Sequence, residues 1–175
     1  GSHIAARIVN PKKKEKKETR HFKTLPNVSI NIDDRDCLVI KAPLLHNDTI
    51  ATNDVVELKT YKKFIWKGRY DNVVNSGGIK LFPEEIEAKL QPLIKHRFFI
   101  SSLPDDALGN RLILLVEQGY DKITHLSLQK NINNLKTLGK FEIPKEIFFL
   151  PQFLETENGK LQRQKTLQLV TDQNH

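Results

Sequence analysis

Residues 66–90 constrain the fold of this chain more than any other stretch. They hold the sequence Gly-Arg-Tyr-Asp, then the paired glycines Gly77 and Gly78, and then Pro83 with acidic residues directly behind it. Paired glycines allow the backbone to turn sharply or another group to approach it closely. A proline followed by glutamates is typical of the first turn of a helix. The stretch therefore predicts a junction near residues 69–72, where one structural piece ends and another begins.

The residues before this junction have the pattern of short strands. Residues 28–32 alternate between apolar and polar side chains, and residues 37–42 are expected to form the second strand of a hairpin. Residues 50–58 and 61–66 form a second such pair. We therefore expect residues 1–70 to be mainly β, with no helix long enough to cover them.

The residues after the junction have a mixed pattern. A helix is predicted from Pro83 for about three turns, until Pro92 ends it. An amphipathic helix is predicted over residues 123–138, closed by Gly139. Residues 161–175 are expected to be a polar tail after a tight Asn158-Gly159 turn. Strands are predicted at residues 97–102, 111–117 and 146–150.

The sequence thus predicts an α+β fold in two parts. Residues 1–70 would form a β-rich piece. Residues 71–175 would form a small α+β domain with a central sheet of about three strands flanked by helices.

The net charge of +7 raises the question of nucleic-acid binding. Much of the excess lies in the lysine-rich run at residues 12–18, where glutamates are interspersed. No aromatic residue interleaves with that run, so it offers no stacking platform for single strands. We interpret it as a solvated loop, and we expect neither a nucleic-acid nor a membrane partner.

Other functional classes find little support in the sequence. No apolar run approaches the roughly 20 residues that a membrane span needs. The histidines are scattered, and there is no Cys/His spacing for a metal, no Gly-x-Ser-x-Gly elbow and no Walker-type phosphate loop. The single cysteine, Cys37, excludes an internal disulfide and fits a reducing, cytoplasmic location.

Three short segments carry chemistry. Asp54 follows Thr-Asn at the end of an extended segment, where its carboxylate could accept two hydrogen bonds from a ribose diol or could simply stabilise a turn. Arg69 offers a planar fork of donors for hydroxyls or phosphate. Gly77 and Gly78 would admit a ligand or form a bulge. Lys160, in the Asn-Gly-Lys turn, would present a positive charge to a phosphate or carboxylate, or would be an ordinary surface lysine.

The order and spacing of these segments resemble the C-terminal part of the acyl-CoA synthetase/adenylate-forming (AMP-binding) superfamily. The resemblance covers about residues 26–166. Within the superfamily, the segments near residues 52–58 and 68–81 are most similar to o-succinylbenzoate–CoA ligases of menaquinone biosynthesis. The matching segments are Thr52-Asn53-Asp54, Gly68-Arg69-Tyr70-Asp71-Asn72, Gly77-Gly78, Pro83-Glu84-Glu85-Ile86-Glu87 and Gly159-Lys160-Leu161-Gln162-Arg163.

This resemblance implies an ATP-dependent ligase that forms an acyl-adenylate and then an acyl-CoA thioester. Asp54 and Arg69 would contact the ribose of the nucleotide. Asp71 would be the hinge of a mobile C-terminal lid. Lys160 would reach the α-phosphate and the substrate carboxylate.

The resemblance further implies that Gly77 and Gly78 lie beside the channel for CoA. The substrates would be ATP, CoA and a small carboxylic acid, with Mg²⁺ accompanying ATP but finding no ligands in this chain. Residues 1–70 would be the β-barrel-like end of a large N-terminal adenylation domain, and residues 71–175 would be its lid.

The sequence also departs from the family pattern. Asn53 replaces the usual glycine, and Asn72 replaces the second aspartate of the hinge motif. The phosphate loop and acyl pocket of the family are missing, so we expect a fragment that needs the N-terminal part of its own enzyme and is inactive alone. Two alternatives stay open. One is another acyl-CoA synthetase or adenylate-forming ligase with a different carboxylate substrate, and the other is a non-catalytic binding module with the lid fold.

Overall fold

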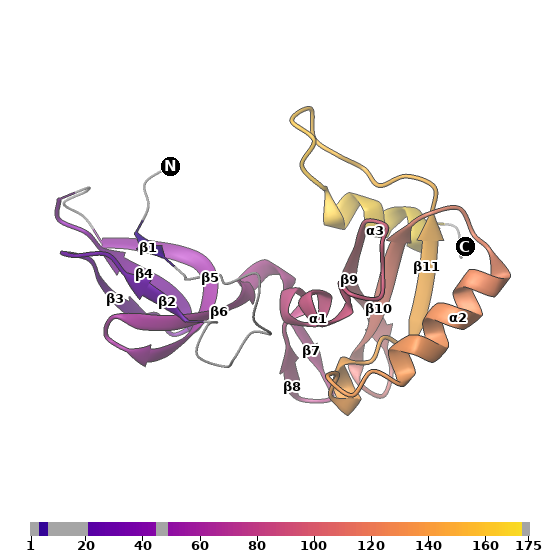
Figure 1. Ribbon diagram of the computed structural model, residues 1–175, viewed down its shortest axis with the longest axis horizontal. Coiled ribbons are helices and arrows are strands. Elements are labelled where there is room, and N and C mark those ends of the chain that lie inside the picture. Colours follow the sequence, from indigo (N-terminus) through magenta and orange to yellow (C-terminus); the bar gives the residue numbers. More distant parts are fainter. Residues whose placement is uncertain (1–3, 7–20, 45–48, 173–175) are drawn as a thin grey trace. The chain divides into compact units, whose positions relative to one another are not determined.

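The computed structural model of the 175-residue chain describes residues 4–6, 21–44 and 49–172 (Figure 1). The lysine-rich run at residues 12–18 lies outside the described residues. The chain divides into two compact units, Gly1–Asp71 and Asn72–His175. Each unit is described below by itself.

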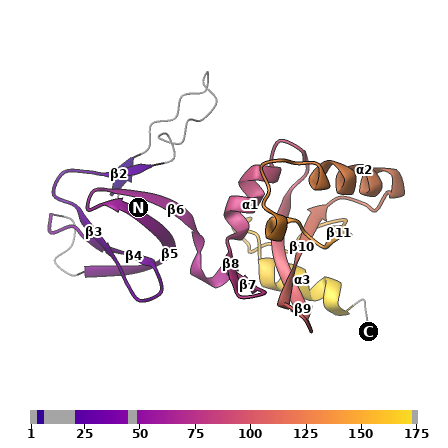
Figure 2. The ribbon, with the colours of Figure 1, turned by 90° about the horizontal axis from the view of Figure 1, so that it is seen from below.

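The first unit is a six-stranded antiparallel sheet, which is strongly curled (Figures 1 and 2). The strands lie in the order β1-β2-β6-β5-β4-β3. Both hairpins expected from the sequence are present, since β3 pairs with β4 and β5 pairs with β6. The strands are β1 (Ala5–Ala6), β2 (Phe22–Thr24), β3 (Ser29–Ile32), β4 (Cys37–Lys41), β5 (Thr49–Thr60) and β6 (Lys63–Arg69).

One face of this sheet carries the core of the first unit. Alternate residues of each strand point to the same face, so Ile30, Ile40, Val56 and Phe64 come together although they lie far apart in the sequence. Phe22 stacks on Phe64 with ring centroids 5.3 Å apart. The side chains of Ile30, Ile40, Val56 and Phe64 are thereby removed from water, which stabilises the sheet.

The second unit is built around a three-stranded sheet with the order β11-β10-β9. The pair β10–β9 is antiparallel and the pair β10–β11 is parallel. A short hairpin, β7–β8, comes before α1. The elements are β7 (Val74–Ser76), β8 (Ile79–Leu81), α1 (Pro83–Leu90), β9 (Phe98–Asp105), β10 (Gly109–Glu117), α2 (Lys122–Asn133), η3 (Lys140–Glu142), β11 (Glu146–Leu150) and α3 (Arg163–Asp172).

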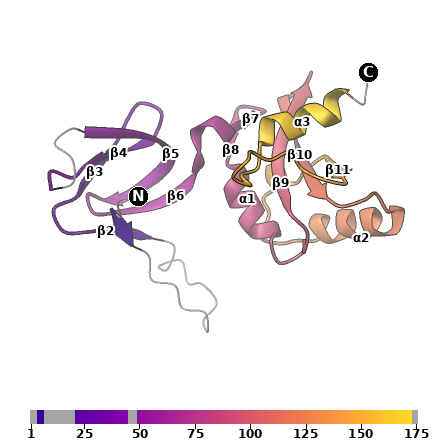
Figure 3. The same ribbon diagram turned by 90° about the horizontal axis from the view of Figure 1, so that it is seen from above.

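Helices cover both faces of this sheet. Figures 2 and 3 show α1 and α2 on one face and α3 on the other. The central strand β10 explains this arrangement, because Leu112 and Leu114 join the core under α1 and α2, whereas Ile113 and Leu115 join the core under α3. A strand buried on both faces needs a continuous apolar run, and residues 112–116 supply one.

The end of the chain differs from the polar tail expected from the sequence. Residues 163–172 form helix α3, which buries Thr166 and Val170. Val170 belongs to the same core cluster as Phe99 and Phe153. The segment looks polar because only a narrow stripe of it is buried, and such a stripe is hard to detect over ten residues.

Helix α2 also ends earlier than expected, at Asn133 and not near Gly139. Asp121 caps its beginning by accepting a hydrogen bond from the Thr124 amide at 2.7 Å. Beyond Asn134 the chain turns, and Gly139 precedes η3.

The structure confirms the α+β fold class and its arrangement of a β-rich piece followed by a three-stranded sheet with helices. No helix within the described ranges combines the length and apolarity required to cross a membrane.

Candidate functional site

The side chains of Asp54, Trp66 and Arg69 lie close together in the first unit. Asp54 lies on β5 directly opposite Arg69, which ends β6. The Asp54 carboxylate accepts a hydrogen bond through Oδ1 from the indole Nε1 of Trp66 at 3.1 Å. Arg69 Nη1 lies 3.7 Å from the same oxygen. The structure thus brings Asp54 and Arg69 together and places Trp66 beside them.

An irregularity in strand pairing makes this convergence possible. Val56 pairs with Trp66, whereas the preceding residue, Val55, pairs with Gly68, so Lys67 is an extra residue on β6. Such a β-bulge shifts the alternation of the strand by one residue. Trp66 and Arg69 are three residues apart, and in a regular strand they would point to opposite faces. The bulge turns both toward Asp54.

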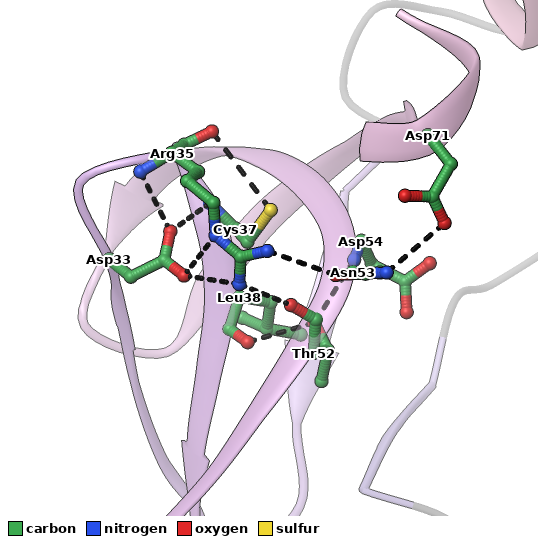
Figure 4. A network of polar contacts seen from close by, with 8 residues as sticks. All are labelled: Asp33, Arg35, Cys37, Leu38, Thr52, Asn53, Asp54 and Asp71. Atoms are coloured by element: carbon green, nitrogen blue, oxygen red, sulfur yellow. Dashed lines mark hydrogen bonds and ion pairs between the residues drawn. The ribbon is translucent and has the colours of Figure 1, made fainter.

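The residues before Asp54 fix its backbone. Thr52 Oγ1 donates to the carbonyl oxygen of Leu38 at 2.8 Å and accepts from the Asp54 amide at 3.1 Å. The threonine hydroxyl therefore ties β5 to β4 at the point where Asp54 emerges (Figure 4).

Asn53 connects the expected hinge residue to the sheet. Its Nδ2 donates to Asp71 Oδ2 at 3.1 Å, and its Oδ1 accepts from Arg35 Nη1 at 3.1 Å (Figure 4). Asp71 itself lies in the 3-10 turn η2 (Tyr70–Asn72), which follows β6. The amide side chain at this position thus bridges a cation and a carboxylate, which the glycine usual in the family cannot do.

Arg35 is held in turn by a neighbouring carboxylate. Its Nη2 and Nε donate to Asp33 Oδ2 at 2.7 Å and 3.0 Å. The guanidinium also lies over the Tyr70 ring, 5.1 Å from its centroid. The Arg35 side chain lowers the pKa of the Asp33 carboxyl below its ordinary value, so the pair stays ionised at neutral pH. Sequence reasoning treated residues 33–36 only as a turn and missed this role.

Gly77 and Gly78 form the turn between β7 and β8. Both have positive φ angles, 56° and 78°, as a tight hairpin turn with two left-handed residues requires. The Gly77 amide donates to the Leu108 carbonyl oxygen at 2.9 Å, and a Cβ at Gly77 would lie 3.3 Å from Leu108 Cδ2. The group that approaches the Gly77 backbone closely is therefore Leu108, in the loop between β9 and β10.

Lys160 ends a turn in the second unit. Its amide donates to Thr156 Oγ1 at 3.1 Å, and its carbonyl oxygen accepts from the Thr156 amide at 2.8 Å. The side chain is exposed, and within the described residues its ammonium group makes no hydrogen bond or ion pair. The turn before α3 and the β7–β8 hairpin lie at different ends of the second unit (Figure 1).

The turn of Lys160 is anchored by an ion pair at the start of α3. Arg163 Nη1 and Nη2 donate to the two carboxylate oxygens of Glu87 at 2.7 Å and 2.8 Å. Glu87 Oε1 also accepts from the Ile100 amide at 2.8 Å. Burial raises the pKa of the Glu87 carboxyl, and Arg163 and the Ile100 amide oppose that rise. The ion pair thereby joins the Pro83–Glu87 segment to the Gly159–Arg163 segment, more than seventy residues later in the chain.

The chemistry available at these positions is recognition and charge stabilisation. Asp54 offers acceptors, and Arg69 and Lys160 offer positive charge. In the part of the chain that the structure describes, no group of three or more His, Cys, Asp or Glu side chains is arranged to hold a metal ion.

Comparison of the sequence with known proteins identifies relatives over part of the chain. No protein-family model matches it. The acetyl-coenzyme A synthetase of Chlorobaculum tepidum is 32% identical over 117 residues, which are 62% of this chain and 17% of that protein. The chain therefore spans less than a fifth of the length of this curated relative.

Comparison of the structure with solved structures extends the match. An acyl-CoA synthetase (AMP-forming)/AMP-acid ligase II-like protein from Dyadobacter fermentans superposes with a TM-score of 0.55 and 31% identity, covering 96% of this chain and 47% of that one. E. coli MenE, solved with a bound analogue of OSB-AMS, superposes with a TM-score of 0.61. At 24% identity, over 86% of this chain and 35% of that one, MenE shows the fold alone. Homologous sequences and structural neighbours together place this chain in the acyl-CoA synthetase/AMP-forming ligase superfamily, with the fold of the C-terminal part of such ligases.

Proposed function

We propose that residues 1–175 are the C-terminal part of an ATP-dependent, AMP-forming acid–CoA ligase of the cytoplasm. In the first half-reaction a carboxylate oxygen attacks the α-phosphorus of ATP, giving an acyl-adenylate and releasing pyrophosphate. In the second, the CoA thiol attacks the acyl carbon and AMP leaves. The observation that carries the proposal is the pairing of Asp54 with Arg69 across β5 and β6, because this pair matches the two nucleotide-contacting motifs of the superfamily.

The two units would have different tasks in such an enzyme. Residues 1–70 would complete the large adenylation domain, with Asp54 accepting hydrogen bonds from the ribose hydroxyls and Arg69 as a second ribose contact. Residues 71–175 would form the lid, with Asp71 as its hinge. The β-rich and α+β composition of the two units supports this division of tasks.

Lys160 would supply charge stabilisation in the first half-reaction. An exposed ammonium at the tip of a turn can reach a phosphate oxygen and a carboxylate as negative charge develops between them. Closure of the lid would then complete the site, and reopening would admit CoA beside Gly77 and Gly78. Mg²⁺ would enter with ATP.

The carboxylate substrate we propose is o-succinylbenzoate, as in menaquinone biosynthesis. The support is the similarity of residues 68–81 to such ligases and the fold shared with MenE, whose bound ligand is an analogue of OSB-AMS. A different carboxylate is the second candidate, because the 32% identical relative is an acetyl-coenzyme A synthetase.

The first test compares residues 1–175 with the longer enzyme of which we propose they are part. With ATP, Mg²⁺ and o-succinylbenzoate, the longer enzyme is expected to release pyrophosphate and the 175-residue chain is not. Robust release by the purified 175-residue chain would contradict the proposal that it is a fragment.

The second test concerns Lys160 in the longer enzyme. Lys160→Ala should slow pyrophosphate release by about 100-fold, the order of magnitude seen when one transition-state donor is removed. Thioester formation from preformed acyl-adenylate should change much less, because that step does not involve ATP. Lys165→Ala is the matched control, since Lys165 is also an exposed lysine and lies on α3. Equal losses in both half-reactions would refute the assigned role.

The third test identifies the substrate. The longer enzyme is offered o-succinylbenzoate, acetate, benzoate and medium-chain acids, and kcat/KM is measured for each. A clear preference for any acid other than o-succinylbenzoate would remove the menaquinone assignment and leave the ligase class intact.

A further inference from the structure

Trp66 is the only tryptophan of the chain, and it is 39% exposed. A large aromatic side chain that stays this accessible at the edge of a core needs an explanation. On β6 it shares a face with the buried Phe64, and its cross-strand partner Val56 is buried as well. Trp66 therefore stands where the core of the first unit meets solvent, beside Asp54.

The contacts of Asp54 are strongly asymmetric. Trp66 Nε1 donates to Oδ1 at 3.1 Å, and Arg69 Nη1 lies 3.7 Å from the same oxygen. Across the described residues, no hydrogen bond to the carboxylate involves Oδ2. The side chain is one-third exposed, so Oδ2 keeps its acceptor capacity for a ligand.

This geometry fits a ligand that is apolar on one surface and carries two neighbouring hydroxyl groups. An indole donor on Oδ1 fixes the rotation of the carboxylate, so that Oδ2 has one orientation toward an incoming diol. The indole ring beside it offers a flat apolar wall for a sugar or a base, and indole–base contacts tolerate any base because every base has a π-face. Arg69 adds a positive charge 3.7 Å from the same oxygen.

We propose that Trp66 holds the Asp54 carboxylate in position, as a positioning residue, and that its ring forms one wall of the subsite in which Asp54 binds the vicinal diol of a nucleoside. This inference rests on the proposed function. The two roles are separable by substitution. Trp66→Phe keeps an aromatic wall and removes the indole donor, whereas Trp66→Leu removes both. Asp54→Asn keeps the shape of the carboxylate and removes its charge.

The single tryptophan also provides the measurement. In a ¹H–¹⁵N spectrum of the full 175-residue chain, the indole gives one Nε1–H signal, whose position reports its hydrogen bond to Asp54. Asp54→Asn should move that signal in the absence of any ligand. Titration with AMP should then shift it in a saturable way, and 2′,3′-dideoxy-AMP, which keeps the base and phosphate but lacks the diol, should have much less effect.

We expect Trp66→Phe to weaken AMP binding by roughly ten- to a hundredfold, as the loss of one hydrogen bond to a charged acceptor implies. The change is followed on the backbone amides of β5 and β6. Trp66→Leu should weaken it further. Tyr61→Phe is the control, because Tyr61 is another exposed aromatic residue of the first unit, at 72% exposure. That variant should bind AMP like the unaltered chain.

The outcomes distinguish the role of Trp66 from the ribose contact of Asp54 that the proposed function assigns. If Asp54→Asn abolishes AMP binding and Trp66→Phe does not change it, the role of Trp66 is refuted and the ribose contact of Asp54 stands. If AMP binds but Asp54→Asn leaves binding intact, the ribose role of Asp54 fails as well. No response of the indole signal to AMP, or an equal response to the dideoxy nucleotide, would overturn the diol subsite.

Discussion

The ion pair between Glu87 and Arg163 is the contact whose removal we expect to destabilise the second unit most. Their side chains are 16% and 26% exposed, and the pair is bidentate. Arg163 also lies over the Phe99 ring, 5.3 Å from its centroid. Arg163→Met would keep the apolar packing of the side chain and leave the Glu87 carboxylate without its cation.

The magnitude follows from the burial of the pair. Removing one partner of a buried ion pair costs about 3–5 kcal/mol, because the other charge is left uncompensated. Glu87 retains the Ile100 amide and some solvent access, so we expect the lower end, about 3 kcal/mol. For a unit of about 100 residues, this corresponds to a fall in Tm of roughly 15 °C.

The free energy of unfolding that Arg163→Met loses should depend on pH. Burial already raises the pKa of the Glu87 carboxyl, and removing Arg163 raises that pKa further. A group whose folded-state pKa lies above its unfolded value stabilises the fold fully below the unfolded value, about 4.3 for Glu, and less as pH rises through the folded pKa. The deficit of Arg163→Met relative to the unaltered chain should therefore be largest at neutral pH and shrink toward pH 4.

Thermal and urea unfolding followed by circular dichroism at 222 nm measures this effect, because the α-helices of the described residues all lie in the second unit. Arg111→Met is the control. Its partner Glu146 is 44% exposed, so the loss there should stay below about 1 kcal/mol. If Arg163→Met cost no more than Arg111→Met, or if its deficit grew at low pH, the reasoning from burial would be wrong.

Three further predictions follow from the first unit and from the hairpin of the second. Asn53→Gly removes the hydrogen bond to Asp71, which is worth about 1 kcal/mol, so amide exchange in the η2 turn should speed up about fivefold. Unchanged exchange would show that Asn53 does not restrain Asp71. Gly77→Ala puts a side chain against Leu108 on a residue with a left-handed backbone, so it should lower the free energy of unfolding of the second unit by about 1–2 kcal/mol. Urea unfolding measures this, and an unchanged free energy would mean that the hairpin turn relaxes freely. Burial raises the pKa of the Cys37 thiol, so its alkylation at pH 8 should be much slower in the folded chain than in urea, and equal rates would contradict its burial.

The sequence was most informative where a local pattern has a local cause. Pro83 at the first helical position and the acidic residues behind it predict α1, and the structure has α1 at Pro83–Leu90. The Gly77-Gly78 pair predicts a tight turn, and both residues have positive φ. The α+β fold class follows from such signals, because strand alternation and helix caps depend on neighbouring residues.

The sequence was less informative where burial depends on distant partners. Helix α3 looked like a polar tail because its stabilisation comes from Glu87 and from a core that includes Phe99, both more than sixty residues before the helix. Arg35 looked like part of a turn because its partner Asn53 lies 18 residues away, on strand β5. No local pattern carries this information.

The difference between what the sequence determines and what the tertiary structure determines is clearest around Asp54. The sequence by itself determined that Asp54 and Arg69 are present, in the order that the resemblance to adenylate-forming ligases leads us to expect. Only the tertiary structure decided that Trp66 joins them, because one extra residue at Lys67 changes which way β6 points its side chains. A strand alternates with period two, so a single bulge reverses every later side chain, and the register of a bulge is set by the neighbouring strand.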